Sequence, residues 1–150
     1  MRITTKGRYA LRASVALAKM GKNGDLVSIS NICAAENLSP IFLEQIFFNL
    51  KKAGLVKSVR GPGGGFNLLY PPDKLTVREI LTAAGEVLSV SNCDKSSAVC
   101  ERRNECKSHN VWMKLNDLIN EYLHSLTLAS LLEDDWPVND NNEYEISKEQ

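Results

Sequence analysis

The apolar residues in the first third of the chain recur at intervals of three and four positions, which predicts amphipathic helices. One helix is expected over residues 8–20, and a short one over residues 29–37, where Ser28 can act as the N-cap. A third is expected over residues 40–53, with Pro40 at its first position. Its buried side would carry Leu43, Ile46, Phe47 and Leu50.

After Gly54 the helical spacing gives way to two short strand-like runs, LVKSVR and FNLLY, which are joined by the segment GPGGG. Two helices joined by a tight turn and followed directly by a hairpin are typical of a winged helix-turn-helix. The predicted fold is therefore mainly α with a small β-hairpin wing.

The later part of the chain predicts two more helices and a polar tail. Thr76 and Glu79 have capping-box spacing for a helix over residues 77–88. A long helix over residues 110–126 carries a broad apolar stripe, and a second copy of this helix is its natural partner in a homodimer. The segment from Glu133 onward is acidic and Asn-rich, and we expect it to be mostly disordered. The stripe consists of Trp112, Leu115, Leu118, Ile119, Tyr122, Leu123 and Leu126.

These patterns divide the chain into a winged helix-turn-helix domain (1–75), a cysteine loop with dimerisation helices (76–132) and an acidic tail (133–150). A length of 150 residues suffices for one compact domain and a small second lobe. The start has no apolar signal-peptide core, and no apolar run reaches membrane-spanning length. We therefore expect a cytoplasmic protein, in which stable disulfides are uncommon.

The net charge of zero conceals a strong asymmetry between the two halves of the chain. Residues 1–80 hold 12 Lys/Arg and 5 Asp/Glu, a balance of +7, whereas residues 81–150 hold 6 and 13, a balance of −7. A basic half in a neutral chain suggests that this half meets a polyanion.

The helix expected over residues 40–53 has a polar side suited to DNA. Glutamine can pair with adenine, lysine can contact phosphate, and a glutamate can accept from cytosine. Apolar residues at the start of such a helix can touch thymine methyl groups. The alternative is a solvated helix face with its first apolar residues in the core. The candidates are Ile41, Phe42, Glu44, Gln45 and Lys51.

The glycine-rich hairpin favours the DNA interpretation. Arg60 adjoins a turn without side chains, where backbone can approach backbone closely, and an arginine suits a narrow minor groove. An ordinary flexible turn is one alternative; a nucleotide-binding loop is another, but the segment lacks the G-K-[ST] ending and does not open a helix. Ser58 and Gly61 complete the predicted DNA-contacting set.

The polar segment CDKSSAVCERRNECKSH (93–109) contains three cysteines and a histidine with little apolar sequence around them. Thiolates are soft ligands suited to iron–sulfur clusters or zinc, and neighbouring basic residues can lower the thiol pKa. Inert loop cysteines, a structural zinc site and a thiol switch are the alternatives. Cys33 lies among Ile and Ala in a predicted helix, so we interpret it as a small buried apolar residue.

The opening MRITTKGRYALRA, the block LEQIFFNLKKAGLVKSVRGPGGGF and the loop ending in CKSH resemble the IscR-type family of winged-helix iron–sulfur cluster regulators. The resemblance covers about residues 1–132 and implies a dimeric transcriptional regulator in which cluster occupancy changes which DNA sites are bound. A dimer of this kind suits a palindromic site. It also implies a [2Fe–2S] cluster held by Cys93, Cys100, Cys106 and His109. Among the DNA-facing residues it implies roles for Ser39, Glu44, Gln45 and Arg60, with Glu44 tied to sequence discrimination.

Two other functions stay open. A nitric-oxide-sensing branch with similar cysteines holds a [4Fe–4S] cluster and takes an acidic ligand near the N-terminus; Arg8 at that position favours histidine ligation here. A carrier or assembly protein could instead hold a cluster without binding DNA, but the basic half and the glycine wing favour DNA. An enzyme is least expected, because no nucleophile–base pair or carboxylate dyad stands out.

Overall fold

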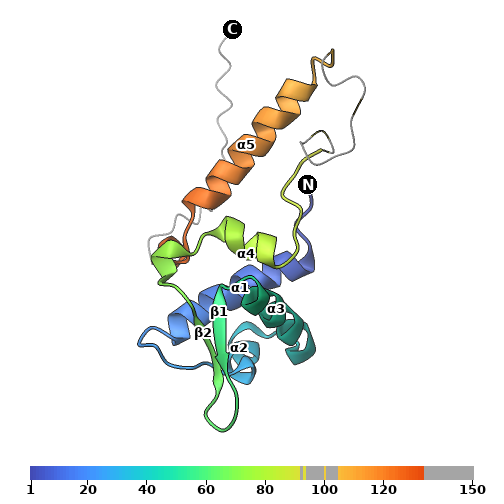
Figure 1. Cartoon of the computed structure of the whole chain (residues 1–150). Helices are drawn as coiled ribbons and strands as arrows, with labels where there is room; N and C mark the ends of the chain where they lie inside the picture. Colours follow the sequence, from blue (N-terminus) through green and yellow to red (C-terminus); the bar gives the residue numbers. More distant parts are fainter. Residues whose placement is uncertain (92, 94–99, 101–104, 134–150) are drawn as a thin grey trace.

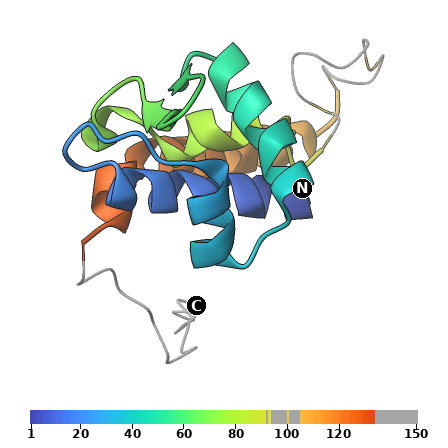
Figure 2. The same cartoon turned by 90° about the horizontal axis from the view of Figure 1, so that it is seen from below.

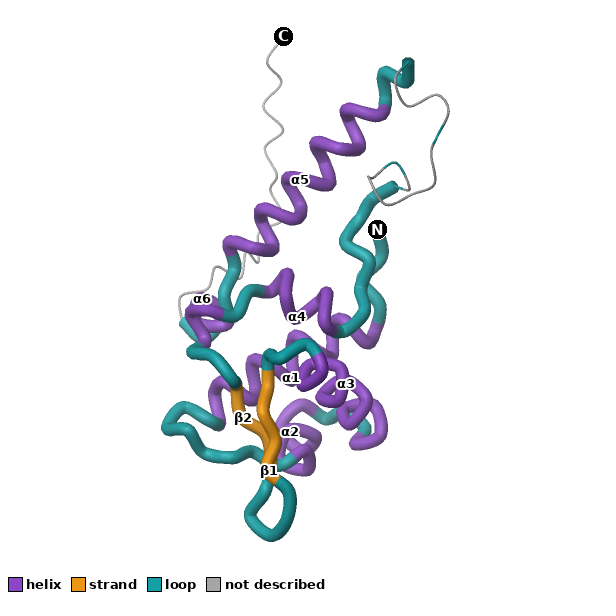
Figure 3. Tube along the Cα trace, viewed as in Figure 1, coloured by secondary structure: helices purple, strands orange, loops and turns teal. Residues whose placement is uncertain are grey.

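The computed structural model describes residues 1–91, 93, 100 and 105–133. It is mainly helical with one antiparallel hairpin, which confirms the predicted fold class (Figure 1). The hairpin lies at one end of the molecule and the long helix α5 extends from the other (Figure 3). The elements are α1 (Thr5–Met20), α2 (Ile29–Glu36), α3 (Pro40–Lys52), β1 (Val56–Val59), β2 (Gly65–Leu68), the 3-10 turn η1 (Pro72–Lys74), α4 (Val77–Ala83), α5 (His109–Ser125) and α6 (Leu128–Leu131).

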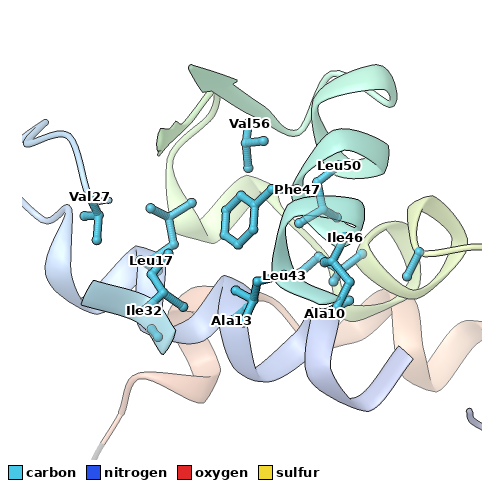
Figure 4. Close-up of a cluster of buried hydrophobic side chains, with 14 of the residues drawn as sticks. Ala10, Ala13, Leu17, Val27, Ile32, Leu43, Ile46, Phe47, Leu50 and Val56 are labelled. Carbon is cyan, nitrogen blue, oxygen red and sulfur yellow. The ribbon is translucent and has the colours of Figure 1, made fainter. Parts of the chain in front are cut away.

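Helices α1, α2 and α3 enclose the hydrophobic core, and the start of α2 follows the expected capping signal. Ser28 accepts a hydrogen bond from the Asn31 amide at 3.1 Å and so caps α2. Phe47 is fully buried at the centre of the cluster in Figure 4, a burial worth about 1.5–3 kcal/mol for an aromatic side chain. The expected buried face of α3 is confirmed, because Leu43, Ile46, Phe47 and Leu50 are all buried.

The hairpin packs against this core through its second strand. β1 and β2 pair in register from Val56–Leu68 to Val59–Gly65. Phe66 on β2 pairs with the extended residue Val27 and places its ring 4.7 Å from that of Phe47. The wing is therefore fixed to α3 by an aromatic contact.

Helix α4 begins as expected and ends earlier than expected. Thr76 and Glu79 form the predicted capping box. The predicted extension to residue 88 is wrong: the helix ends at Ala83, and Gly85 adopts φ +91°. The Glu86 amide then bonds back to the Leu81 carbonyl, which ends the helix with a left-handed glycine and turns the chain away.

The core also includes residues on the C-terminal side of the expected division at residue 75. Leu128 of α6 is fully buried, and its amide donates to the Leu75 carbonyl at 2.9 Å. The Val77 amide likewise donates to the Leu126 carbonyl. Thus α4 and α6 pack on the helical core, and the division into domains stays a prediction. Of the tail expected to be disordered (133–150), residues 134–150 lie outside the described residues.

Helix α5 is attached to its own chain by a polar seam. Asn116 is its buried residue; this side chain accepts a hydrogen bond from the Val90 amide at 2.8 Å. Asn120 donates to the Leu88 carbonyl and accepts from the Arg78 guanidinium at 3.0 Å. Several of the predicted apolar stripe residues stay exposed in the single chain, namely Trp112, Leu115, Leu118 and Tyr122.

Candidate nucleic-acid interface and metal centre

The predicted DNA-facing residues at the start of α3 lie on the outside of the molecule. Ile41 is 81% exposed and Phe42 is 40% exposed, so the alternative that they belong to the core is wrong. The Phe42 ring meets the Tyr9 ring edge-on, with centroids 5.6 Å apart. Glu44 and Gln45 are also exposed, on the face opposite the buried side. Figure 2 shows α3 beside the hairpin when the molecule is seen from below.

Ser39 occupies the N-cap position of α3 but does not cap it in the expected way. Its side chain makes no capping hydrogen bond, and the Leu43 amide bonds instead to the Ser39 carbonyl at 3.1 Å. Pro40 has no amide hydrogen, which leaves one fewer donor to satisfy in this turn. The Ser39 side chain is therefore an exposed polar group beside Ile41.

Two of the predicted DNA-contacting residues bond to each other. The Lys51 ammonium donates to the Ser58 hydroxyl at 2.6 Å and so links the end of α3 to β1. Gln45 donates to Asn49 one helical turn later, at 3.4 Å. Together with the Phe47–Phe66 contact, the Lys51–Ser58 bond fixes the wing relative to α3.

The turn of the wing depends on its glycines. Gly61 and Gly63 adopt φ values of +96° and +72°, a region that other residues rarely adopt. Arg60 precedes them, exposed at the tip of the hairpin, where the chain forms a loop at the bottom of Figure 1. The arrangement presents one cation beside a turn in which Pro62 is the one residue with a side chain among four glycines.

A group of basic residues at the start of α1 lies outside the set of residues that the sequence predicts to contact DNA. Arg2, Lys6 and Arg8 line an open hollow together with Phe42 of α3. The excess of basic residues in the first half was the available signal, but charge counting does not show which cations gather at one place. Arg12, on the same helix, is bound internally by Glu36 at 3.0 Å.

A buried carboxylate holds the start of α1 against the end of α4. Glu86 is 8% exposed and accepts from the amides of Thr4 and Gly7, each at 3.1 Å, and from the Thr4 hydroxyl. Burial raises the pKa of Glu86, but these hydrogen bonds outweigh it, and the net shift is downward. Because Glu86 begins the segment that runs to Cys93, it ties this segment to the helical core.

Glu79 has a lowered pKa for a related reason. The Thr76 amide donates to its carboxylate at 2.8 Å, which is the main cause, and the Thr76 hydroxyl and the positive charges of His124 and Arg78 add to it. His124 itself is exposed, as expected for a surface residue.

The predicted metal ligands are distributed along the cysteine loop: Cys93 lies at its start, Cys100 in its middle, and Cys106 and His109 at its end. Cys93 is half-buried and Cys100 is exposed. Cys106 contacts the Ser108 hydroxyl at 3.2 Å, and its carbonyl accepts from the amide of His109, the first residue of α5. Within the described residues no three His, Cys, Asp or Glu side chains converge as metal ligands; much of the intervening loop lies outside them.

Cys33 differs from the loop cysteines. It is buried in α2 among core residues, as expected for a small apolar side chain.

None of the helices within the described ranges combines the length and apolar character needed to cross a membrane.

Comparison with known proteins extends the similarity over nearly the whole chain. Residues 3–134 match the family model Rrf2, described as an iron-dependent transcriptional regulator. A helix-turn-helix-type transcriptional regulator of Neisseria meningitidis is 43% identical over 133 residues, which cover 89% of this chain and 88% of the relative.

Solved structures of two named regulators are similar to this chain. CymR, the global cysteine regulator of B. subtilis, is 33% identical with a TM-score of 0.71, covering 88% of this chain and 96% of CymR. IscR of T. potens is 34% identical with a TM-score of 0.66, covering 89% and 88%. Because the identities and TM-scores to CymR and IscR are similar, they do not show which of these two regulators the chain resembles more in function. The extent of the family match and the identity to the Neisseria regulator place this chain in the Rrf2 family of DNA-binding transcriptional regulators, which are not enzymes.

Proposed function

We propose that this regulator is a homodimer whose choice of palindromic DNA sites is controlled by a [2Fe–2S] cluster. The observation that carries the DNA-reading part is the outward face of α3, where Ile41 and Gln45 are exposed beside a wing that is joined to the same helix. A recognition helix enters the major groove by its first turns, and a wing can reach the adjacent minor groove.

Within that arrangement each exposed residue has a chemical role. Gln45 pairs with adenine, Glu44 accepts from cytosine or rejects other bases, and Ile41 and Phe42 contact thymine methyl groups. Arg60 enters the minor groove, and Gly61 lets the backbone approach the DNA. Ser39, Lys51 and Ser58 contact phosphates, with Lys51 and Ser58 acting as one bonded unit.

The exposed apolar stripe of α5 supports the homodimer. Leu118 is 50% exposed and Tyr122 is 60% exposed, although both belong to the stripe that predicts a helix partner. Contiguous apolar surface of this kind marks an interaction site in a soluble protein. Two copies packed through α5 would present two copies of α3, as a palindromic site requires.

The donor set of the cysteine loop fits an iron–sulfur cluster. Cys93, Cys100 and Cys106 supply three thiolates and His109 supplies an imidazole, a softer and more electron-rich set than carboxylates offer. His109 is the first residue of α5, where the helix dipole favours a negatively charged centre. A bound cluster would supply redox and iron-responsive chemistry. The chain's own part is to hold it beside α5 and the Glu86 segment.

Anaerobic purification with absorption spectroscopy and iron and sulfide analysis tests the cluster. We expect about two irons and two sulfides per chain, and loss of the chromophore on substituting any loop cysteine by Ala. Cys33→Ala is the matched control, because this thiol is buried in the core. Four irons per chain would favour the nitric-oxide-sensing alternative, and a metal-free loop would refute cluster control.

Binding to a cognate duplex and to generic duplex DNA tests the DNA interface. Arg60→Ala should weaken cognate binding by about 1–3 kcal/mol, the scale of a good base contact. The fold should be unchanged, since Arg60 is exposed. Lys74→Ala, an exposed cation of the η1 turn, is the control. Equal affinities of Arg60→Ala and the parent would remove Arg60 from the interface.

A further inference from the structure

A second basic surface adjoins the N-terminal end of α3, whereas the Lys51–Ser58 bond joins the wing to the C-terminal end of this helix. It is an open hollow of about 650 Å³ whose lining includes Arg2, Thr4, Thr5, Lys6, Arg8 and Phe42. Three cations therefore surround one hollow whose wall is completed by a side chain of α3. The predicted DNA-contacting residues include Phe42 but none of these cations.

The cations of the hollow are available to an outside ligand. Arg2 and Arg8 are exposed, and Arg8 uses one of its donors on the Thr5 hydroxyl at 3.2 Å. Arg12, one turn further along α1, differs because it bonds to the Glu36 carboxylate and carbonyl and lies over the Tyr9 ring. Helix α1 thus carries both a cation that is bound internally, Arg12, and one that is available to a ligand, Arg8.

The positive charge that the hollow offers to an anion comes from side chains and not from the backbone amides at the start of α1. Glu86 already accepts from the Thr4 and Gly7 amides. Its carboxylate is buried, and the charge of Lys6 favours its ionised form. An anion at the hollow would therefore contact the guanidinium groups of Arg2 and Arg8 first.

The position of the hollow identifies its ligand. Phe42 lies in the first turn of α3 and contacts Tyr9 of α1, so the hollow directly flanks that end of α3. The major groove is only about 12 Å wide, so a helix end inserted in it lies close to the phosphates of both strands. One phosphate strand would pass the wing and the other would pass the hollow.

We propose that Arg2, Lys6 and Arg8 bind the DNA backbone phosphates that flank the major groove occupied by α3. This inference rests on the proposed docking of α3. The three cations position the protein and carry no base specificity, because phosphates are the same at every base pair.

The test is a salt titration of binding by the full-length double variant Arg2→Gln/Arg8→Gln. Each lost phosphate contact should reduce the slope of log affinity against log salt by about 0.9, so a dimer that loses four contacts should lose about 3.6. Affinity for cognate and for generic duplex should fall by the same factor. Lys19→Gln, at the other end of α1, is the matched control and should keep the parent slope.

The outcomes separate the two proposals. If the double variant keeps the salt slope of the parent, and Arg60→Ala still weakens binding to the cognate duplex, the phosphate contacts are refuted. The proposed DNA interface would then still stand. A loss of cognate preference at constant slope would assign these arginines to base recognition and also overturns the inference. If the parent binds neither duplex, both proposals fail.

Discussion

Gly7 provides a sharp test of the packing between α1 and Glu86. It is the third residue of α1, where alanine would ordinarily be preferred to glycine by up to about 1 kcal/mol. A Cβ added to Gly7 would lie 2.6 Å from Cγ of Glu86 and 2.7 Å from its carboxylate carbon and Oε1. We therefore expect Gly7→Ala to destabilise the protein, against the usual helix preference.

The magnitude follows from the hydrogen bonds of Glu86. Hydrogen bonds to a charged group are worth about 1.5–3 kcal/mol each when they are buried. Glu86 accepts three, but two of them come from Thr4, which is exposed, so water can replace part of this stabilisation. We expect Glu86→Ala to cost about 2–3 kcal/mol in total. Gly7→Ala, which displaces the same carboxylate but gains helix preference, should cost about 1–2 kcal/mol.

The two substitutions should be strongly coupled. In the Glu86→Ala background the space beside Gly7 is open, so Gly7→Ala should stabilise the protein by about 0.5–1 kcal/mol. The sign of the Gly7 substitution would thus reverse, with a coupling free energy of about 2 kcal/mol. Urea denaturation of the four proteins, followed by circular dichroism at one fixed protein concentration, measures the cycle. A stabilising Gly7→Ala in the parent, or additive effects, would refute this account.

Three further predictions concern pH, assembly and the tail. The folded pKa values of Glu79 and Glu86 are lowered, so the two carboxylates contribute fully to stability above the unfolded pKa of about 4.3. This contribution is lost as the pH falls through the lowered folded values. Glu86→Gln should make the free energy of unfolding fall less steeply with pH in denaturation curves at pH 3–6. Leu118→Glu places a charge in the stripe of α5 and should give monomers in sedimentation, whereas Asp117→Lys, exposed on another face of the same helix, should leave assembly unchanged. Truncation after Asp135 should keep dimerisation and DNA binding, and loss of either would show that residues 136–150 are structural.

Local patterns were enough to predict most of the elements. The buried side of α3 follows from its spacing, and the capping box of α4 from two residues three apart. The predicted end of α4 at residue 88 is too late because Gly85 adopts the left-handed conformation that commonly ends helices. A single glycine is a weak signal unless the bonds that it permits are known.

Contacts between distant residues could not be predicted in this way. Glu86 is 79 positions from Gly7 and 82 from Thr4, and a glutamate after a helix ordinarily indicates a solvated loop. The hollow beside Phe42 likewise joins residues 2–8 to α3. Sequence predicted which residues could bind DNA or a cluster. It could not show which cations are already bound within the chain.

The contrast between the polar and apolar sides of α5 supports the proposal that its apolar stripe packs against a partner. A helix that packed on its own chain in the usual way would bury its apolar side and expose its polar side. Here Asn116 and Asn120 are the residues that bind the chain, through the backbone of residues 88–90 and the Arg78 side chain. Hydrogen bonds are directional, so this seam fixes the rotation of α5 about its axis and aims Leu118 and Tyr122 outward. The same seam holds the segment between Glu86 and Cys93. Association through α5, as proposed above, would therefore join the two copies through the helix that also holds residues 88–90.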